Sequence, residues 1–579
     1  MLRRLRPVQP KPIIIRGGHV IDPINKVDCE VMDIGVRDGK IVDPSEIEES
    51  KAMIIDAKGK LVMPGGVDPH THIAGPKFNF GRIMSPQDHR RAWIKATPTR
   101  RCGTGLVVPS TAYIGYKYAQ MGWTTAIEPA TVPLKSRHTH EELDDIPILD
   151  KACYPLLGTN RLVMEFISKG DIESLKCYIA WVLKETKGYA VKIVNPGVAE
   201  PTWWNRYVGL DLDEQLPEFN ITPRDIVRGL CKAVIELKLP HPIHVHCNRL
   251  GFPGNYVTTL KTMDCVSDLA TGDKPIMHIT HVQFTGYAGT GWANLSSGGE
   301  AIAKYLNAHN HVTLDLGQVI FGESLTMTAD APFEYVLYHI MMGKWFGGMA
   351  ESEATTGIVP YLYKKSNYVN TVQWSIGLEV ALLTKDPWKI VFATDNPNAG
   401  RFTKYPLGLS WLVSKKAREE IMAKLNRRGL KHTALPAVDR EYTLYDVAIV
   451  TRAGPAKILG MPEKGHLGVG ADADIAIYDL NPVEVDVSKD YKAFIRAFKR
   501  ALYTIKSGVI VVKDGEVVEP NLYGSTYYVD ATKALDPDAY KSTVNYVKEA
   551  FPKLYSVSFE NYVIGEHELR KPLKVEVAK

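Results

Sequence analysis

Short apolar runs alternate with polar and turn residues near both ends of the chain. Between residues 12 and 62, the segments PIIIRGGHVID, VMDIGVRDGKIV and KAMIIDAKGKLV are rich in β-branched residues and separated by glycine-containing turns. The same pattern returns in GHLGVGADADIAIYDL (465–480) and IKSGVIVVKDGEVV (505–518). Such runs, broken by Gly and Asp-Gly, are typical of β-hairpins. We therefore predict hairpins of the same kind in both regions.

A different pattern fills the long middle of the chain, where each apolar strand-like run is followed by a helical stretch. Such alternation predicts an α/β fold with a (β/α)8 TIM barrel, because each helical crossover returns the chain to the start of a neighbouring parallel strand. The eight predicted strands lie in GGVDPHTHI, GWTTAIEPA, ACYPLLG, YAVKIVNPG, PIHVHCN, PIMHITHVQF, HVTLDLGQVI and KIVFATDNPN.

These patterns predict four regions. Residues 63–450 form the barrel, and residues 1–62 and 451–525 form the β-rich regions that precede and follow it. Residues 526–579 form a separate charged and aromatic C-terminal extension. The loop after the first barrel strand, roughly 76–110, is long and rich in Pro, Gly and Arg, which is typical of a lid or a subunit contact.

Composition narrows the class of protein. A chain of 579 residues with 45% hydrophobic and 23% charged residues is an ordinary globular protein of several domains. The net charge of +5, from 70 basic and 65 acidic residues, is too small to indicate nucleic-acid binding. The basic start MLRRLRPVQPKP leads into prolines, and no apolar run approaches the length of a membrane span. Seven scattered cysteines without a CxxC pair predict a cytoplasmic protein without an iron–sulfur site of its own.

Polar residues stand where the predicted barrel strands end, which is the face that carries barrel active sites. His70 and His72 are two residues apart, so in a strand both rings face the same side and can reach one metal ion. A bare HxH motif is more often a solvated turn, so the interpretation depends on the other strands. Those strands supply Lys192, His244, His246, His278, His281 and Asp395.

Strand geometry selects among the paired histidines. His244 and His246 share a face, and we prefer His246 as a ligand because it is nearer the C-terminal end. His278 and His281 face opposite sides of their strand, and His281 is the one nearer the end. His278 is therefore expected to pack or to orient a neighbour. The predicted ligands of a two-metal site are His70, His72, Lys192, His246, His281 and Asp395.

Lys192 lies inside AVKIV, an otherwise apolar run. An ammonium beside two divalent cations would be repelled, and burial and positive neighbours both favour the neutral amine. A neutral amine can add carbon dioxide to become a carbamate, which is a bridging, carboxylate-like ligand. The alternative is a lysine that reaches from the strand end to solvent.

This set of residues resembles the amidohydrolase superfamily. Its pattern is HxH on strand one, a carboxylated lysine on strand four, histidines on strands five and six, and aspartate on strand eight. Within it, MPGGVDPHTHIAGPKFNFGR, AVKIVNPG, HVHCNRLGFPGNY, HITHVQFTGY and FATDNPNAG are similar to the family of catalytic hydrolase subunits of formylmethanofuran dehydrogenases. The likeness covers most of the chain, and HVHCNRLG with HITHVQF carries it most specifically. The resemblance to the urease-like and dihydropyrimidinase-like branch implies a composite β-sandwich split between the chain ends, with residues 1–62 as its N-terminal part and 451–525 as its C-terminal part.

The resemblance implies a division of labour in a multisubunit complex, at the first step of methanogenesis. A partner subunit with a tungsten or molybdenum pterin reduces carbon dioxide to formate, and iron–sulfur subunits supply its electrons. This subunit condenses formate with the primary amine of methanofuran, the one-carbon carrier, or hydrolyses formylmethanofuran in reverse.

In the expected mechanism, His70, His72, Lys192 and Asp395 hold one metal ion, and Lys192, His246 and His281 hold the other. Zinc suits imidazole and carboxylate ligands, although manganese and iron use the same ligand types. Asp395 is the catalytic residue, which takes a proton from the attacking water and delivers it to the leaving nitrogen.

Substrate contacts are expected from residues beside the strand ends. Methanofuran carries carboxylates in its tail, and Arg249 and Arg82 could bind them. Asn248 could orient the formyl or amide group. The aromatic stretch TWWNRYVG (202–209) fits a substrate wall or subunit contact as well as it fits a core. A second HxH, His138 and His140, lies in a polar segment and is expected to be solvated.

Three alternatives stay open. The corresponding component of bacterial formyltransferase/hydrolase complexes is a relative that the sequence does not cleanly separate from the favoured archaeal type. A stand-alone dihydropyrimidinase or hydantoinase shares the fold and metals but differs at strands five and six. A non-catalytic scaffold protein of the complex would have lost ligands, whereas this chain has the full set.

Overall fold

The computed structural model describes residues 11–198, 210–272, 274–350 and 354–578. The aromatic stretch at 202–209 and most of the basic start lie outside the described residues. Among the helices that are described, none is both long and apolar enough to cross a membrane.

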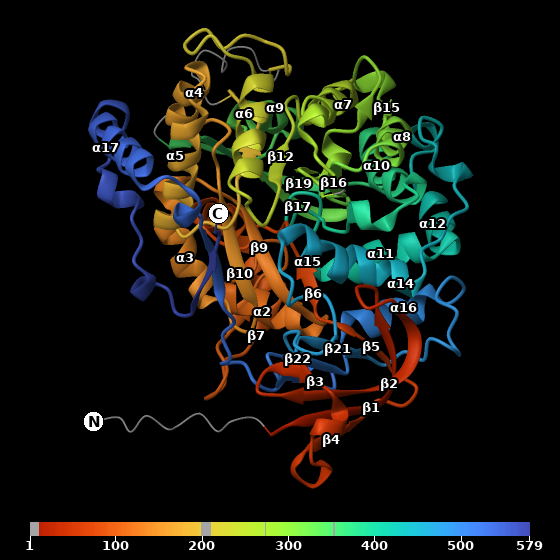
Figure 1. The fold of residues 1–579 in the computed structure, drawn as a ribbon. Coiled ribbons are helices and arrows are strands. Elements are labelled where there is room, and N and C mark those ends of the chain that lie inside the picture. Colours follow the sequence, from red (N-terminus) through yellow and green to blue (C-terminus); the bar gives the residue numbers. More distant parts are fainter. Residues whose placement is uncertain (1–10, 199–209, 273, 351–353, 579) are drawn as a thin grey trace.

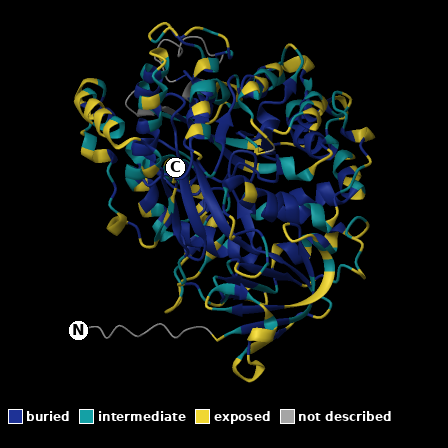
Figure 2. Cartoon of the chain, viewed as in Figure 1, coloured by how far each residue is buried: buried dark blue, intermediate teal, exposed yellow. Residues whose placement is uncertain are grey.

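The middle of the chain forms the predicted barrel, and the eight predicted strands all appear in the described part (Figure 1). They run parallel to one another, and each pairs with or bridges to the next in chain order. Figure 2 shows these strands as the buried centre of the molecule. The strands are β6 (Gly66–Asp68), β9 (Trp123–Thr131), β10 (Asp150–Pro155), β11 (Lys192–Val194), β12 (Ile243–His246), β13 (Met277–Ile279), β16 (Val312–Asp315) and β20 (Ile390–Val391).

Helices connect successive strands on the outside of the barrel. In α6, Thr222 caps the first turn in a capping box with Asp225, and Pro223 occupies the first helical position. The helices of the barrel are α2 (Thr111–Gln120), α3 (Ser136–Asp145), α4 (Arg161–Ser168), α5 (Ile172–Glu185), α6 (Pro223–Glu236), α7 (Tyr256–Asp264), α8 (Gly299–Ala308), α10 (Tyr368–Leu383), α11 (Tyr405–Val413), α12 (Lys415–Met422), α13 (Arg427–Leu430), α14 (Leu444–Ala448) and α15 (Gly454–Leu459).

Two isolated β-bridges connect neighbouring barrel strands beside residues of the predicted site. Leu156 bridges to Lys192, which links β10 to β11, and Thr71 bridges to Asn396, which links the first strand end to the last. The His72 amide donates to the Asn396 carbonyl at 2.8 Å, and the Asn396 side-chain amide donates back to the His72 carbonyl at 2.9 Å. The chain segments that carry His72 and Asp395 are therefore fixed side by side.

Both ends of the chain build one β domain, which lies below the barrel in Figure 1. Its nine described strands form one sheet around a core that includes Ile15, Ile34 and Ile475. The sheet returns on itself, because the Ile41 amide donates to the Ala471 carbonyl at 2.9 Å. The prediction of a composite β domain is confirmed. Its strands are β1 (Ile13–Asp22), β2 (Val27–Arg37), β3 (Lys40–Val42), β4 (Met53–Asp56), β5 (Leu61–Pro64), β21 (Ile475–Tyr478), β22 (Tyr503–Lys506), β23 (Val509–Lys513) and β24 (Glu516–Val517), with helix α16 (Tyr491–Lys499) between β21 and β22.

The C-terminal residues differ from the predicted separate extension. Strand β25 (Thr526–Asp530) pairs in parallel with barrel strand β10, and β26 (Pro572–Glu576) pairs with β25. Between them, α17 (Pro537–Leu554) packs against α5. The tail joins the barrel because it has apolar residues to bury, among them Val529, Val547 and Phe551.

Two long insertions into the barrel, called excursions below, lie at the C-terminal ends of the barrel strands. The predicted loop at 76–110 contains α1 (Pro76–Met84), β7 (Trp93–Ile94) and β8 (Gly103–Thr104). The other excursion separates β16 from α10, and its sheet has the order β17-β19-β18. Phe80 of α1 stacks on Phe346 of this excursion, with ring centroids 4.3 Å apart. The elements of the second excursion are β17 (Gly322–Thr328), α9 (Ala331–Met341), β18 (Phe346–Ala350) and β19 (Ala354–Tyr363).

A buried ionic cluster ties the β domain to the barrel. Lys506 Nζ lies 2.6 Å from Asp150 Oδ2 and 2.8 Å from Asp474 Oδ2, and Lys464 Nζ lies 2.5 and 2.9 Å from the same two oxygens. Burial favours the neutral carboxyls, but the two ammonium groups outweigh it and lower the pKa of Asp150 and Asp474. Because these pKa values are depressed on folding, the stabilisation is present above the unfolded value of about 4. It is lost as the pH falls through the lower folded value.

Replacing Lys506 by methionine is expected to lower the free energy of unfolding by about 3–5 kcal/mol, because buried carboxylates lose a partner. Urea denaturation at neutral pH measures the loss, which should shrink as the pH falls below about 4. Lys60→Met is the matched control, since Lys60 forms a partly exposed ion pair with Asp479 outside the cluster; such pairs contribute about 1 kcal/mol or less. Equal effects of the two substitutions would contradict the assignment.

Candidate metal centre

His70 and His72 lie in the turn that follows β6, and both imidazoles are buried. Asp68 organises this turn, because its carboxylate accepts the His70 amide at 3.1 Å and the Tyr118 hydroxyl at 2.7 Å. The Nε2 atoms of His70 and His72 each lie 3.1 Å from Oδ1 of Asp395, which follows β20. Two imidazoles and one carboxylate from opposite ends of the barrel sequence thus converge on one point.

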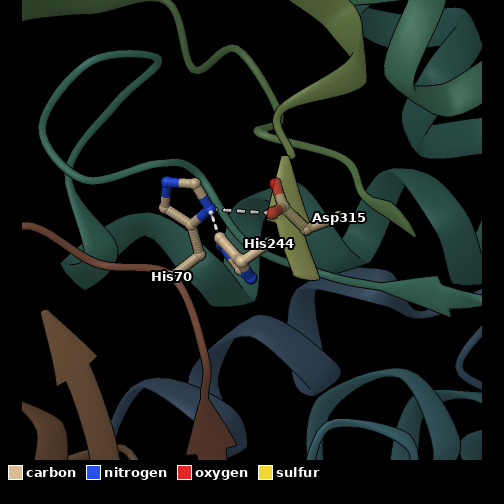
Figure 3. A group of neighbouring side chains, drawn as sticks. All are labelled: His70, His244 and Asp315. Carbon is tan, nitrogen blue, oxygen red and sulfur yellow. Dashed lines mark hydrogen bonds and ion pairs between the residues drawn. The ribbon is translucent and has the colours of Figure 1, made fainter. Parts of the chain in front are cut away.

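Buried carboxylates hold the other nitrogen of each ring. His70 Nδ1 lies 2.8 Å from Asp315 Oδ2, and His72 Nδ1 lies 2.9 Å from Glu128 Oε1. Figure 3 shows the first contact, together with His244, whose Nε2 lies 3.1 Å from the same His70 nitrogen. A carboxylate on Nδ1 fixes the ring tautomer and leaves the Nε2 lone pair free for a metal ion.

Three polar atoms from three strand ends are buried there and form no hydrogen bond with any described residue. They are Lys192 Nζ, His246 Nε2 and His281 Nδ1. Burial of polar atoms without partners is costly, and metal coordination is one way to satisfy them. His70, His281 and Asp395 also offer ligand atoms that all lie within 4.8 Å of one another. This set of imidazole, carboxylate and amine groups fits divalent metal ions.

Backbone strain accompanies three of these strand ends. Asn195, His281 and Asp395 have φ angles of 39°, 35° and 47°, in the left-handed region that residues other than glycine rarely occupy. The His281 conformation is held by Asp315, whose Oδ1 accepts the His281 amide at 2.6 Å. Such strain clusters at functional sites, where the surrounding structure maintains it.

A cavity of about 500 Å³ opens above these residues and is lined by His70, His72, Lys192, His246, His281 and Asp395. Its walls are mostly apolar and come in part from the excursion that separates β16 from α10, including Met327, Phe333 and Tyr363. Glu334 of α9 also lines the cavity, and it accepts the Thr326 hydroxyl at 2.7 Å. An apolar cavity of this size with a few polar groups at its base is typical of an enzyme active site.

A family model described as "Amidohydrolase family" matches residues 53–512. The chain belongs to the amidohydrolase family. A protein named FwdA from Methanocaldococcus jannaschii is 46% identical over 560 residues, which cover 96% of this chain and 96% of that protein. The A component of the formyltransferase/hydrolase complex Fhc from Methylorubrum extorquens is 34% identical over 532 residues, 91% of each chain.

Solved structures agree with this membership. A chain in the crystal structure of the FhcABCD complex from Methylorubrum extorquens, solved with methylofuran, matches with a TM-score of 0.86 and 31% identity, covering 98% of this chain and 100% of that one. A D-aminoacylase matches with a TM-score of 0.50 and 14% identity, covering 89% of this chain and 99% of that one, and shares the fold. The resemblance to the amidohydrolases, and to the hydrolase subunits of formylmethanofuran dehydrogenases within them, is confirmed.

Burial governs the protonation of this amidohydrolase centre. It lowers the pKa of Lys192 to about 7, so a substantial fraction of the amine is neutral at physiological pH. It also lowers the pKa of His281 to about 4, which keeps this imidazole neutral and able to bind a metal ion. For Asp395 burial acts in the opposite sense, but the neighbouring His281 and His70 outweigh it and lower the pKa of the carboxyl.

Sequence reasoning missed three acidic residues of the site. Asp315 and Glu128 lie in strands that were predicted, and the same search for polar residues in apolar strands would have found them. Glu334 lies in the excursion, where no pattern pointed to the cavity. Burial raises its pKa well above the ordinary value, which favours the protonated carboxyl.

The predicted substrate contacts do not line the described cavity. Arg82 donates to Glu142 at 3.1 Å and to Asn79 at 2.7 Å, and Asn248 donates to the Pro196 carbonyl at 3.2 Å. Arg249 has a φ of 60°, and this turn brings the next residues, Leu250 and Gly251, to the cavity wall instead.

The second HxH lies in helix α3, where residues two apart point in different directions. His138 is exposed as expected, but the expectation of a solvated pair is wrong for His140. His140 is buried, and its Nε2 donates to the Thr186 carbonyl at 3.0 Å. Neither belongs to a group of possible metal ligands within the described ranges.

Asp315→Asn is expected to weaken metal binding about 10–100-fold, because the carboxylate that orients His70 and His281 is lost. Metal retention against a competing chelator measures the effect. Glu379→Gln is the matched control, since Glu379 is a buried carboxyl that contacts Ser297 and Ala434 outside the centre. Unchanged metal retention in Asp315→Asn would refute an orienting role for this carboxylate.

Proposed function

We propose that this amidohydrolase hydrolyses the formamide bond of formylmethanofuran, or forms it from formate and methanofuran, as the hydrolase subunit of a formylmethanofuran dehydrogenase complex. The supporting observation is the likeness, along nearly the whole chain, to one chain of a complex solved with methylofuran. The greater identity to FwdA of Methanocaldococcus jannaschii favours the archaeal type over the bacterial one.

We propose that two divalent metal ions, with zinc as the expected metal, bind at the strand ends. His70, His72, Lys192 and Asp395 would hold one ion, and Lys192, His246 and His281 would hold the other. Lys192 would serve both as an N6-carboxylated lysine, because a carbamate can bridge where an ammonium would be repelled. Bound ions would lower the pKa of a water molecule and polarise the formyl carbonyl.

The residues of the chain then have distinct roles. Asp395 accepts the proton of the attacking water and delivers it to the amine nitrogen as the C–N bond breaks, and the reverse direction requires an unprotonated amine. Asp315 and Glu128 keep the His70 and His72 rings aligned throughout. The apolar walls keep bulk water away from the reacting groups. Glu334 lies at the cavity wall, where its carboxyl can contact the substrate; the substrate contacts predicted for Arg82, Asn248 and Arg249 stay predictions.

This function assigns the redox step to other subunits. All seven cysteines are free thiols distributed over the fold, so this chain offers no cluster of cysteine ligands. We propose that a tungsten or molybdenum pterin subunit produces formate in the cytoplasm, with electrons from iron–sulfur subunits, and that the formate reaches the cavity described above.

The test is the release of formate from formylmethanofuran by the purified protein, with hydantoin and dihydrouracil as comparison substrates. We expect turnover of the linear formamide together with about two metal ions per chain. Turnover of hydantoin alone would favour the cyclic amidohydrolase alternative. A native complex that contains metal-free protein would favour the scaffold alternative.

A further inference from the structure

A second cavity, of about 650 Å³, lies on the flank of the barrel beside the β domain. It is bordered by α2, the segment after β7, the turn after β20, and residues between α16 and β24. It shares no lining residue with the cavity of the metal centre. Seven of its lining side chains are cationic. Lys117 and Arg500 are two of them, and the other five belong to Lys95, Arg100, Arg401, Lys404 and Lys499.

These five cations form no direct ion pair with a described residue. Among the residues that the structure describes, their side chains form no salt bridge and no hydrogen bond. Asp88 attracts Arg401 without contacting it; its Oδ2 accepts three backbone amides at 2.9–3.1 Å, and its Oδ1 has no hydrogen-bond partner among the described residues. The acidic residue that lines the cavity, Glu516, is paired with a further cation, Arg500.

Repulsion between these cations is evident in their protonation. Burial lowers the pKa of Lys404, and the neighbouring Arg401 and Lys499 lower it further. Lys117 lines the same cavity; burial lowers its pKa, Glu516 opposes this, and nearby Arg500 and Lys499 lower the pKa further. A concave group of like charges is unfavourable by itself and attracts a multivalent anion.

The remaining walls indicate which anion fits. Trp93, with 65% of its surface exposed, and the buried rings of Tyr113 and Tyr116 line the cavity. Aromatic faces stack well on planar heterocycles. Lysine ammonium groups and arginine guanidinium groups both bind phosphate oxygens, the former as point charges and the latter as a planar fork. The volume lies within the range of small-molecule sites.

We propose that this cavity is a second ligand site, which binds a phosphorylated small molecule with a planar ring, of the nucleoside diphosphate class. The phosphates lie against Lys404, Lys499 and Arg401, and the ring lies against Trp93. The site is independent of the hydrolytic reaction proposed above, because it neither shares residues with the metal centre nor requires a metal ion.

Calorimetric titration of the full-length chain with ADP tests this proposal, with citrate as a multivalent carboxylate of similar charge. We expect one ADP site per chain that weakens steeply with salt, and much weaker binding of citrate. The double variant Lys404→Ala/Lys499→Ala should lose at least about tenfold in ADP affinity, which follows from loss of two charge-assisted contacts. Formamide hydrolysis in the absence of ADP should be unchanged.

Lys424→Ala/Lys431→Ala is the matched control, because both lysines are exposed and lie outside the cavity. It should bind ADP as the unaltered chain does. Citrate binding as tight as that of ADP would overturn the proposal in favour of an oligocarboxylate ligand or an acidic partner segment. Absence of ADP binding, or equal affinity in both double variants, would also overturn it. If the double variant does not fold, Lys404→Gln provides the same comparison.

Discussion

Asp395→Asn is expected to lower the rate of formylmethanofuran hydrolysis by at least about 10³-fold while the fold stays intact. General acid–base catalysis alone contributes about 10²–10⁴-fold, and the same substitution removes an anionic oxygen on which the Nε2 atoms of His70 and His72 converge. Asparagine occupies nearly the same volume, so the strained backbone at this position should be retained. The measurement is kcat under saturating substrate, with metal content determined on the same sample.

Asp486→Asn is the control for this substitution, because Asp486 is a surface residue that caps Ser488. It should leave kcat within a factor of about two, as expected for a surface substitution. Hydrolysis by Asp395→Asn at a rate near that of the unaltered chain would show that another group transfers the proton. A loss of metal with a proportional loss of rate would assign Asp395 a ligand role only.

Lys192→Ala is expected to lower hydrolysis at least about 100-fold and to reduce bound metal. Even the loss of a residue that merely orients a ligand costs about 10–100-fold, and Lys192 Nζ stands among the unsatisfied atoms of the centre. The deletion leaves a space the size of the missing side chain, so a short carboxylic acid such as propionate should restore part of the metal content and the rate. Intact mass measurement of the unaltered chain should reveal the added carbon dioxide.

Lys151→Ala is the matched control, because Lys151 is also a buried lysine on a neighbouring barrel strand. Its ammonium donates to the Ile146 carbonyl at 3.1 Å, away from the metal centre. This control should lose stability but not respond to propionate. Full activity of Lys192→Ala without added acid would exclude the carbamate, and rescue of both variants would show that the effect is unspecific.

Much of the fold could be predicted because strands and helices of a barrel have different apolar periods. The eight strands and the hairpins at both ends follow from local patterns that the structure retains, and the resemblance implied that the two ends meet in one β domain. The tail was harder to place, since β25 is a short apolar run whose parallel partner β10 is distant in sequence. No local sequence pattern indicates which barrel strand such a strand will pair with.

The residues of the site also fall into two groups, those that the sequence predicted and those that it did not. His70, His72 and Asp395 could be found because polar residues at the ends of apolar strands are conspicuous, and the structure brings them together. Glu334 could not be found, because its burial depends on the excursion folding back over the barrel. The arginine candidates are outside the lining of the described cavity for a related reason: proximity in sequence to a ligand does not determine the direction of a side chain after a left-handed turn such as that at Arg249.

The pairing of β5 with β21 has a consequence for how the protein is made. Pro64 lies opposite Ile475 in this sheet, and His70 follows a few residues after Pro64. During synthesis, the segment that leads to the first ligands must therefore wait for most of the chain before its partner strand exists. Such long-range pairing slows folding and exposes an unpaired edge meanwhile. The β domain beside the predicted ligands His70 and His72 is therefore completed only after most of the chain has been synthesised.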